Sequence, residues 1–344
     1  AKTEEWNGSA WTELNDLNVG RYGIGGAAQG STSSSLAFGG GSPPAPSKSA
    51  ATEEWNTGIS VGAWSTSTSM NTGRSQMGSN GTSTSALGYG GTTTAGVAIT
   101  ESWNGSAWTE VADLSTPTFT NAGAGADNTS ALSIAGQVAG PPEYSAKNEQ
   151  WNGSSWTEVG DINSARVQLG GVGIVTSALV FGGYNPPDAK TLTETWNGSS
   201  WTEVADLNTK RRRHASSGTA TNALCSGGSN AGTVSVTDNT ETWNGSSWSE
   251  VNNLNTAREQ IRSAGTTTNA LAFGGSVSPK AQTEDWNGVS WVEVADLNVA
   301  GGRVGRSGGY SDAFAFGRNT PGGNTADAEE WSSTSNVTRT VSTD

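Results

Sequence analysis

Apolar and polar positions alternate in short runs along the chain, and clusters of Gly, Asn, Ser and Thr separate the runs. This pattern predicts short, half-buried strands that are joined by tight turns. In one representative stretch we predict four strands, over residues 212–218, 222–227, 239–243 and 247–254. The last two strands flank an Asn-Gly pair, which favours a tight hairpin because both residues accept a positive φ.

The last two strands of this unit belong to a motif, W-N-G-S-x-W-T-E-V, that recurs with small variations every 43 to 49 residues. The first tryptophan of the well-matched copies is Trp6, Trp103, Trp151, Trp196, Trp243 or Trp286. Degenerate copies begin at Trp55 and Trp331. A second tryptophan follows five residues later in six copies, but it follows nine residues later, as Trp64, in the copy that begins at Trp55. The copy that begins at Trp331 lacks it, and all 15 tryptophans belong to the repeat.

A glutamate lies two residues before each first tryptophan, at Glu4, Glu53, Glu101, Glu149, Glu194, Glu241, Glu284 and Glu329. Eight equivalent carboxylates are not the asymmetric arrangement that an active site needs. We therefore expect these glutamates, like the tryptophans, to have a structural role, such as an ion pair at every junction between repeats.

The spacing of the two tryptophans places them on one face of a hairpin, whether the turn is a two-residue or a four-residue loop. A single four-stranded unit cannot bury that face, but an identical neighbour can. Four strands in each repeat of this length predict an all-β protein, a β-propeller of four-stranded antiparallel blades.

The repeat does not by itself give the number of blades. The chain has seven predicted pairs of first and second strands, but eight predicted hairpins of third and fourth strands. We predict a seven-bladed propeller over residues 1–344 as a single domain. In this prediction the hairpin in residues 1–17 closes the ring, and residues 326–344 form a divergent hairpin or appendage. Three alternatives are closure by the C-terminal hairpin, pairing of the surplus hairpin with a partner chain, and an eight-bladed ring with one half-blade.

Composition excludes several classes of protein. No apolar run is long enough to span a membrane, and a net charge of −13 argues against a nucleic-acid surface. One cysteine and one histidine exclude an internal disulfide and a His-rich metal site. We expect no catalytic residues, no metal and no cofactor. We interpret His214 as a surface or loop residue and Cys225 as a buried thiol in a slot for small side chains.

Two groups of polar residues are candidates for binding. Arg21, Arg166, Arg211 and Arg258 recur where the first strand of a blade begins, with Arg74 and Arg303 at shifted spacings. This partial ring of arginines could hold an anion near the central channel. We favour ion pairs with nearby aspartates and loop carbonyls instead. The loops between the second and third strands vary most, so we expect partners to bind on their face. The candidate residues for this contact are Tyr144, Tyr184, Asn185, Arg211, Arg212 and Arg213.

The Gly-Gly pair after the second strand and the aromatic residue on the third resemble the kelch repeat. The pattern W-N-G-S-S-W-T-E-V…A-L-A-F-G-G is also similar to repeats in structural and tail-fibre proteins of marine tailed phages. This resemblance implies a non-enzymatic viral structural protein, a homo-oligomer that is extracellular or on the virion surface. Its partners would be a host-surface glycan or protein, or other virion proteins. The alternative is a repeat lectin or adhesin with glycan pockets between blades.

Overall fold

The computed structural model describes residues 62–139, 143–230, 235–276 and 280–333, and the backbone of eight short strands in the rest of the chain. The chain divides into two compact units, Ala63–Ser332 and a smaller unit made of Ala1–Gly62 with Ser333–Asp344. The described residues form strands, turns and loops and contain no helix.

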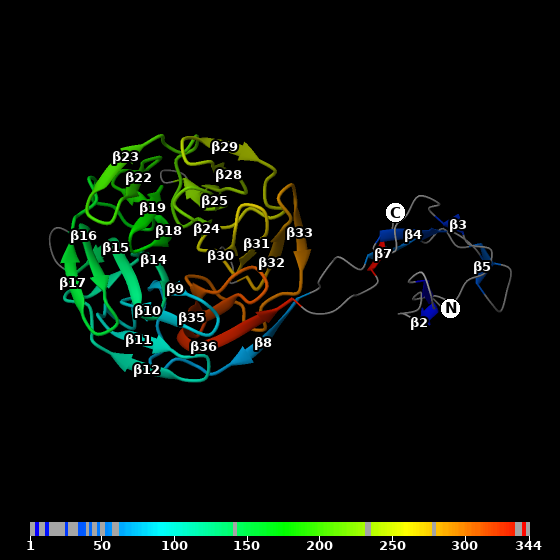
Figure 1. The fold of residues 1–344 in the computed structure, drawn as a ribbon, viewed down its shortest axis with the longest axis horizontal. Coiled ribbons are helices and arrows are strands. Elements are labelled where there is room, and N and C mark those ends of the chain that lie inside the picture. The colour runs from blue at the N-terminus through cyan, green and yellow to red at the C-terminus, as the bar shows by residue number, and fades with distance from the viewer. Residues whose placement is uncertain are drawn as a thin grey trace. The chain divides into compact units, whose positions relative to one another are not determined.

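The larger unit is a β-propeller of six antiparallel blades, arranged around a central axis (Figure 1). Blade 1 contains β9 (Gly78–Gly81), β10 (Ala86–Tyr89), β11 (Thr100–Trp103) and β12 (Trp108–Val111). Blade 2 contains β13 (Thr118–Phe119), β14 (Ala122–Asp127), β15 (Ser130–Val138), β16 (Tyr144–Trp151) and β17 (Trp156–Val159). Blade 3 contains β18 (Gly170–Ile174), β19 (Ser177–Phe181), β22 (Thr193–Trp196) and β23 (Trp201–Val204).

The other three blades follow the same order from the axis outwards. Blade 4 contains β24 (Ala215–Gly218), β25 (Ala223–Ser226), β28 (Thr240–Trp243) and β29 (Trp248–Val251). Blade 5 contains β30 (Arg262–Gly265), β31 (Ala270–Phe273), β32 (Thr283–Trp286) and β33 (Trp291–Val294). Blade 6 contains β34 (Gly305–Ser307), β35 (Phe314–Thr320), β36 (Gly323–Ser332) and β8 (Ala63–Ser67). Small hairpins between second and third strands add β20 (Tyr184–Asn185) with β21 (Asp188–Ala189), and β26 (Ser229–Asn230) with β27 (Ser235–Val236).

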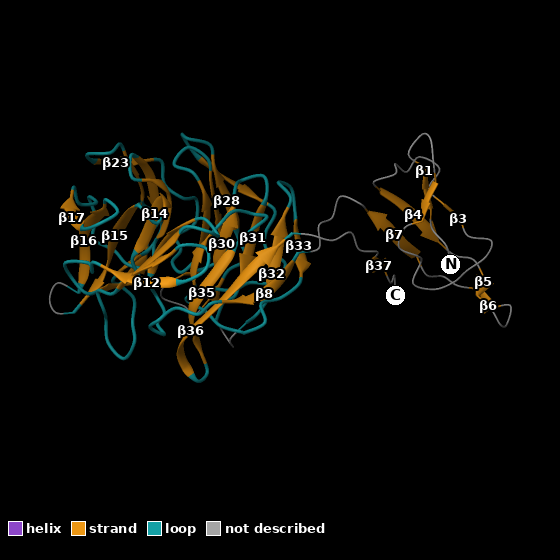
Figure 2. Cartoon of the chain, turned by 60° about the horizontal axis from the view of Figure 1, so that its bottom comes forward, coloured by secondary structure: helices purple, strands orange, loops and turns teal. Residues whose placement is uncertain are grey.

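The repeated tryptophans fill the space between neighbouring blades. Trp103 lies directly opposite Trp108 in the hairpin, so the turn is the four-residue loop of the two that the spacing allowed. The rings of these two residues are 5.4 Å apart, and Trp108 also packs against Phe316 of blade 6 at 4.8 Å. Buried side chains of this kind form the core between blades. The strands of the blades can be followed in Figure 2. Each blade thus buries its indoles against its neighbour, as the periodicity predicted.

The prediction of seven blades, with eight as the alternative, was wrong, because the ring closes in an unexpected place. The outermost strand of blade 6 is β8, in which Trp64 lies opposite Trp331. Trp64 therefore supplies the second tryptophan that the Trp331 copy lacks. In the N-terminal hairpin, which we expected to close the ring, β1 (Glu4–Trp6) pairs with β2 (Trp11–Glu13), and neither strand pairs with another of the strands that the structure describes. The degenerate copies at Trp55 and Trp331 mark this closure.

The smaller unit contains the remaining one of the seven predicted pairs of first and second strands. Its four-stranded sheet has the order β3 (Gly25–Gly26), β4 (Ser34–Phe38), β7 (Thr52–Asn56) and β37 (Arg339–Val341). A two-stranded sheet of β5 (Gly41–Ser42) and β6 (Ser47–Lys48) lies in the connection between β4 and β7. Ala37 lies opposite Glu53 in this unit, as Gly88 lies opposite Glu101 in blade 1. The smaller sheet therefore has the strand register of a propeller blade.

Candidate functional site

One residue of each blade forms a ring around the axis, which we call the axial ring. Its members have φ angles between 56° and 60°, and they are Gln76, Thr120, Gln168, Arg213, Gln260 and Arg303. The backbone N–H of each donates to the carbonyl of the member in the preceding blade, at 2.7 to 3.1 Å, and the N–H of Gln76 donates to Arg303. Six hydrogen bonds thus form a closed circle. The left-handed backbone is sparsely populated for residues other than glycine, and here the circle of hydrogen bonds holds it.

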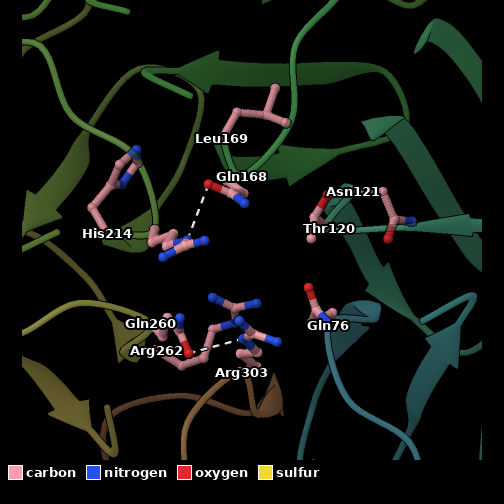
Figure 3. Close-up of a pocket in the computed structure, with 10 residues that line it drawn as sticks. Gln76, Thr120, Asn121, Gln168, Leu169, His214, Gln260, Arg262 and Arg303 are labelled. Atoms are coloured by element: carbon pink, nitrogen blue, oxygen red, sulfur yellow. Dashed lines mark hydrogen bonds between the residues drawn. The ribbon is translucent and has the colours of Figure 1, made fainter. Parts of the chain in front are cut away.

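The side chains of the axial ring line a cavity of about 400 Å³, counting the part that is open to solvent. Figure 3 shows polar groups converging on it from all sides. The remaining lining residues are Asn121, Leu169, His214 and Arg262. We call this space the axial cavity. Its amide and guanidinium groups supply many hydrogen-bond donors.

Three arginines reach the axial cavity, and only one has a carboxylate partner. Arg213 pairs with Glu259 at 3.0 Å and donates from Nε to Gln168. Arg303 donates from Nε to Oε1 of Gln260 at 2.9 Å, which aims its guanidinium (Figure 3). Arg262 donates to the carbonyl of Ile261 at 3.3 Å. Among the described residues, neither Arg262 nor Arg303 forms an ion pair.

Burial and like charge both act on these two arginines. Burial, and then the charges of Arg306 and Arg303, lower the pKa of Arg262 to about 10. Burial, followed by the charge of Arg213, also lowers the pKa of Arg303. Glu259 acts in the opposite direction on the pKa of Arg303. The axial cavity thus gathers three guanidiniums near this carboxylate, which already pairs with Arg213, inside a protein whose net charge is −13. An anion placed between them would remove this repulsion.

A fourth arginine lies farther along the channel. Arg306 of β34 crosses the axis from blade 6 and donates from its Nη2 to the carbonyl of Gly171 at 3.2 Å and to Oγ of Ser216 at 3.3 Å. These partners belong to blades 3 and 4, so Arg306 braces opposite walls of the channel. Burial lowers its pKa to about 10.

His214 lines the same cavity; it lies in the loop just before β24, as one of the two expected alternatives had it, but it is buried and not on the surface. It is 3% exposed and stacks on Phe181 at 5.3 Å. Burial, with a smaller contribution from the charge of Arg211, lowers its pKa to about 3. Gly170 leaves room for the ring, because a Cβ there would lie 2.5 Å from Cε1 of His214. The imidazole is therefore neutral near pH 7, with its Nε2 buried and unbonded among the described residues.

Sequence reasoning included Arg303 among the arginines near the channel but missed Arg262 and Arg306, although the repeat frame contains a signal for both. The residue two positions after the axial ring is Arg262 in blade 5, and it is Gly78, Ala122, Gly170, Ala215 or Gly305 elsewhere. The residue three positions after it is Arg306 in blade 6, and it is Ser79, Gly123, Gly171, Ser216 or Ser263 elsewhere. Two arginines thus break an otherwise small-residue repeat, which gives the channel the asymmetry of a binding site.

The structure brings together part of the loop cluster that the sequence singled out. The guanidinium carbon of Arg212 lies 4.4 Å from the centre of the Tyr184 ring, and Tyr144 meets that ring edge-on at 6.3 Å. Arg212 directly precedes the axial-ring residue Arg213, so this aromatic group adjoins the axial cavity along the chain. Asn185 instead donates to the carbonyl of Ala165 at 2.8 Å.

Arg211 lies apart from this cluster, in a junction clamp that recurs around the propeller. It is fully buried and bonded to Glu241, which also accepts the backbone N–H of Asn208 at 2.8 Å. The clamp therefore ties the loop that enters a blade to the third strand of that blade. The same glutamate position pairs with an arginine in five blades, as Arg74–Glu101, Arg166–Glu194, Arg211–Glu241, Arg258–Glu284 and Arg318–Glu329.

The clamp corrects the partners that we expected for the recurring arginines, which are glutamates of the third strand and not the loop aspartates. Loop carbonyls also take part, since Arg211 donates to Asn239 at 2.7 Å. Glu4 and Arg21 lie outside the residues whose side chains are described, as does Trp6. The other repeat tryptophans, Trp103, Trp151, Trp196, Trp243 and Trp286, are all buried in the propeller.

Comparisons and searches add little to this picture. No protein-family model matches the sequence, and no curated protein matches it. Within the described ranges, no helix has the length and apolar character needed to cross a membrane. The same residues contain no group of three or more His, Cys, Asp or Glu side chains placed to hold a metal ion. The function of the axial cavity is therefore inferred from the residues that line it.

Proposed function

We propose that this protein is a non-enzymatic recognition module that binds an anionic group of its ligand in the axial cavity. The observation that carries the proposal is the pair Arg262 and Arg303, which face the cavity without a carboxylate partner among the described residues. Guanidinium groups bind carboxylate and sulfate through short, charge-assisted hydrogen bonds. Gln168 also lines the cavity, and because its Oε1 accepts from Arg213, its amide nitrogen supplies a neutral donor beside them.

The ligand that we favour is an acidic glycan on a surface. Tyr184 lies against Arg212, the residue before Arg213 of the axial ring, and Tyr144 packs on Tyr184. Aromatic rings of this kind provide flat surfaces for apolar faces of a ligand. The variable loops continue outward from the same positions. In this proposal the protein acts outside the cell as a phage tail-fibre or virion appendage subunit, and the ligand belongs to the host surface.

The repeat lectin that we considered as an alternative would have equivalent pockets at every blade junction. The junction of blades 6 and 1 is filled by indole and phenyl rings, and in blade 4 the buried clamp fills the corresponding loop. The axial cavity, in contrast, occurs once in each propeller. The stoichiometry of binding therefore separates the two functions.

Isothermal titration calorimetry with glucuronic acid, N-acetylneuraminic acid and sulfate tests the proposal, with neutral glucose as the control ligand. We expect at least one of the acids to bind at one site per chain. Arg262→Gln should weaken that binding roughly tenfold or more, because a hydrogen bond to a charged group contributes about 1.5–3 kcal/mol. Lys147→Gln, which removes an exposed cation on a distant strand, should leave it unchanged.

Several outcomes would overturn the proposal. Equal affinity of Arg262→Gln and the parent protein would exclude the axial arginines as the site. Several equivalent sites per chain would favour the lectin. Turnover of a ligand, or a stoichiometric metal in the purified protein, would favour an enzyme.

A further inference from the structure

The outermost strands of the propeller carry a recurring acidic residue, except where the ring closes. Five of these strands have a glutamate two residues after the tryptophan, and all five side chains are exposed. They are Glu110, Glu158, Glu203, Glu250 and Glu293. A charge on an edge strand opposes pairing with another sheet, because the edge otherwise offers free backbone N–H and C=O groups.

The closing strand β8 lacks this protection. Thr66 lies opposite Glu329 in blade 6, as Glu110 lies opposite Glu101 in blade 1, so Thr66 occupies the position of the protective glutamate. Residues 62–73 contain no charged side chain, and Ser65, Thr66, Thr68 and Ser69 are exposed. The nearest carboxylate of the neighbouring strand, Glu330, accepts a hydrogen bond from Ser67 at 2.6 Å.

The other edge of β8 pairs with none of the described strands, since β8 ends the strand order of blade 6. It is also the longest outermost strand, with five residues where the other five have four. Its hydroxyl side chains suit cross-strand hydrogen bonds in an added strand pair. A glutamate-bearing edge would repel a copy of itself in such a pair, and β8 would not.

We propose that β8 is a self-association edge, at which two copies of this chain pair their β8 strands antiparallel about a two-fold axis. Blade 6 of one copy and blade 6 of the other then form one continuous sheet. A two-fold axis presents the same surface from both copies, so a single unprotected strand suffices. The other five edges stay free because their glutamates oppose such pairing.

Sedimentation velocity over a broad range of concentration tests the proposal with the full chain. We expect a monomer–dimer equilibrium in the parent protein. Thr66→Glu, which restores the glutamate of the other blades, should weaken dimerisation about two- to fivefold, because a two-fold axis through Ser65 places the two introduced carboxylates diagonally across the strand pair on one face, where like charges repel. The matched control is Thr202→Glu on β23, which adds the same charge to an edge that already carries Glu203 and should leave the dimer unchanged.

A second variant keeps the test decisive if Thr66→Glu folds poorly. Ser65→Cys lies at the centre of β8 and should form a disulfide-linked dimer under mild oxidation, whereas Thr202→Cys should not. The native Cys225 is buried and does not interfere. A protein that is monomeric at every concentration overturns the proposal. So does a dimer that tolerates Thr66→Glu and gives no crosslink through residue 65.

Discussion

The junction clamp of blade 4 offers a sharp test of how this propeller is held together. Arg211→Thr removes the guanidinium from Glu241, which is fully buried. Three donors remain on that carboxylate, the N–H and Nδ2 of Asn208 at 2.8 and 2.9 Å and the N–H of Thr209 at 3.4 Å. They satisfy its hydrogen bonds but do not neutralise its charge. Removing one partner of a buried ion pair destabilises a protein by about 3–5 kcal/mol.

Blade 2 shows what the substituted site would resemble. Thr118 takes the arginine position there, and Glu149 accepts the backbone N–H of Ser115 at 2.8 Å. Glu149 is 8% exposed, whereas Glu241 is 0% exposed. Of these two glutamates, the one in the blade that has no arginine is thus the less completely buried. Arg211→Thr places threonine beside a glutamate that water does not reach, so its full penalty should appear.

Thermal unfolding of Arg211→Thr should show a midpoint lower by roughly 6–20 °C, taking about 2–4 °C for each kcal/mol. The double variant Arg211→Thr/Glu241→Gln should recover part of this loss, because it removes the buried charge. Lys147→Ala breaks an exposed pair with Glu158 and should cost less than about 1 kcal/mol. A loss of less than about 1 kcal/mol in Arg211→Thr, or no recovery in the double variant, would refute the assignment of the clamp.

Three further predictions concern the channel, the closure and the thiol. In the unfolded chain this histidine protonates below about pH 6.5, whereas His214 in the folded protein stays neutral down to about pH 3. Its contribution to the free energy of unfolding is therefore fully present above pH 6.5, and about 2 kcal/mol of it is lost by pH 5. Denaturant unfolding should show that His214→Leu lacks this part of the pH dependence, and identical pH profiles would contradict it. Trp64→Ala removes the contacts of the closing strand with Phe273 and Trp331 and should cost about 3–5 kcal/mol in the same assay, where a loss below about 1 kcal/mol would argue against closure by β8. Burial raises the pKa of Cys225 to about 12, so a thiol reagent should modify it only after unfolding, and rapid labelling of the native protein would show an open structure.

The four-stranded blades and the pairing of the tryptophans follow from local pattern. Strand period, turn chemistry and repeat length all act over fewer than about 50 residues, and the spacing of Trp103 and Trp108 already limits the hairpin to two registers. The number of blades in the ring does not follow from that pattern. It depends on whether the strand that contains Trp331 pairs with a strand that follows it in the sequence or with the strand of Trp64, which lies 267 residues earlier.

The candidate site was harder to predict, for a related reason. A recurring arginine such as Arg211 attracts attention because it repeats, but repetition here reflects the clamp. Arg262 and Arg306 occur once each in their repeat positions, so a search for shared features passes over them. His214 lies in a run of basic residues that resembles a solvated loop, and only the convergence of six first strands on the axis buries it.

The axial ring separates the width of the channel from its chemistry. Its hydrogen bonds join main-chain atoms only, and its positions already accept glutamine, threonine and arginine with nearly the same φ. The aperture is thus set by the backbone, while the charge presented to a ligand is set by six interchangeable side chains. Exchanging Arg303 for glutamine, or Gln76 for arginine, would change which ligands the opening admits while its diameter stays the same.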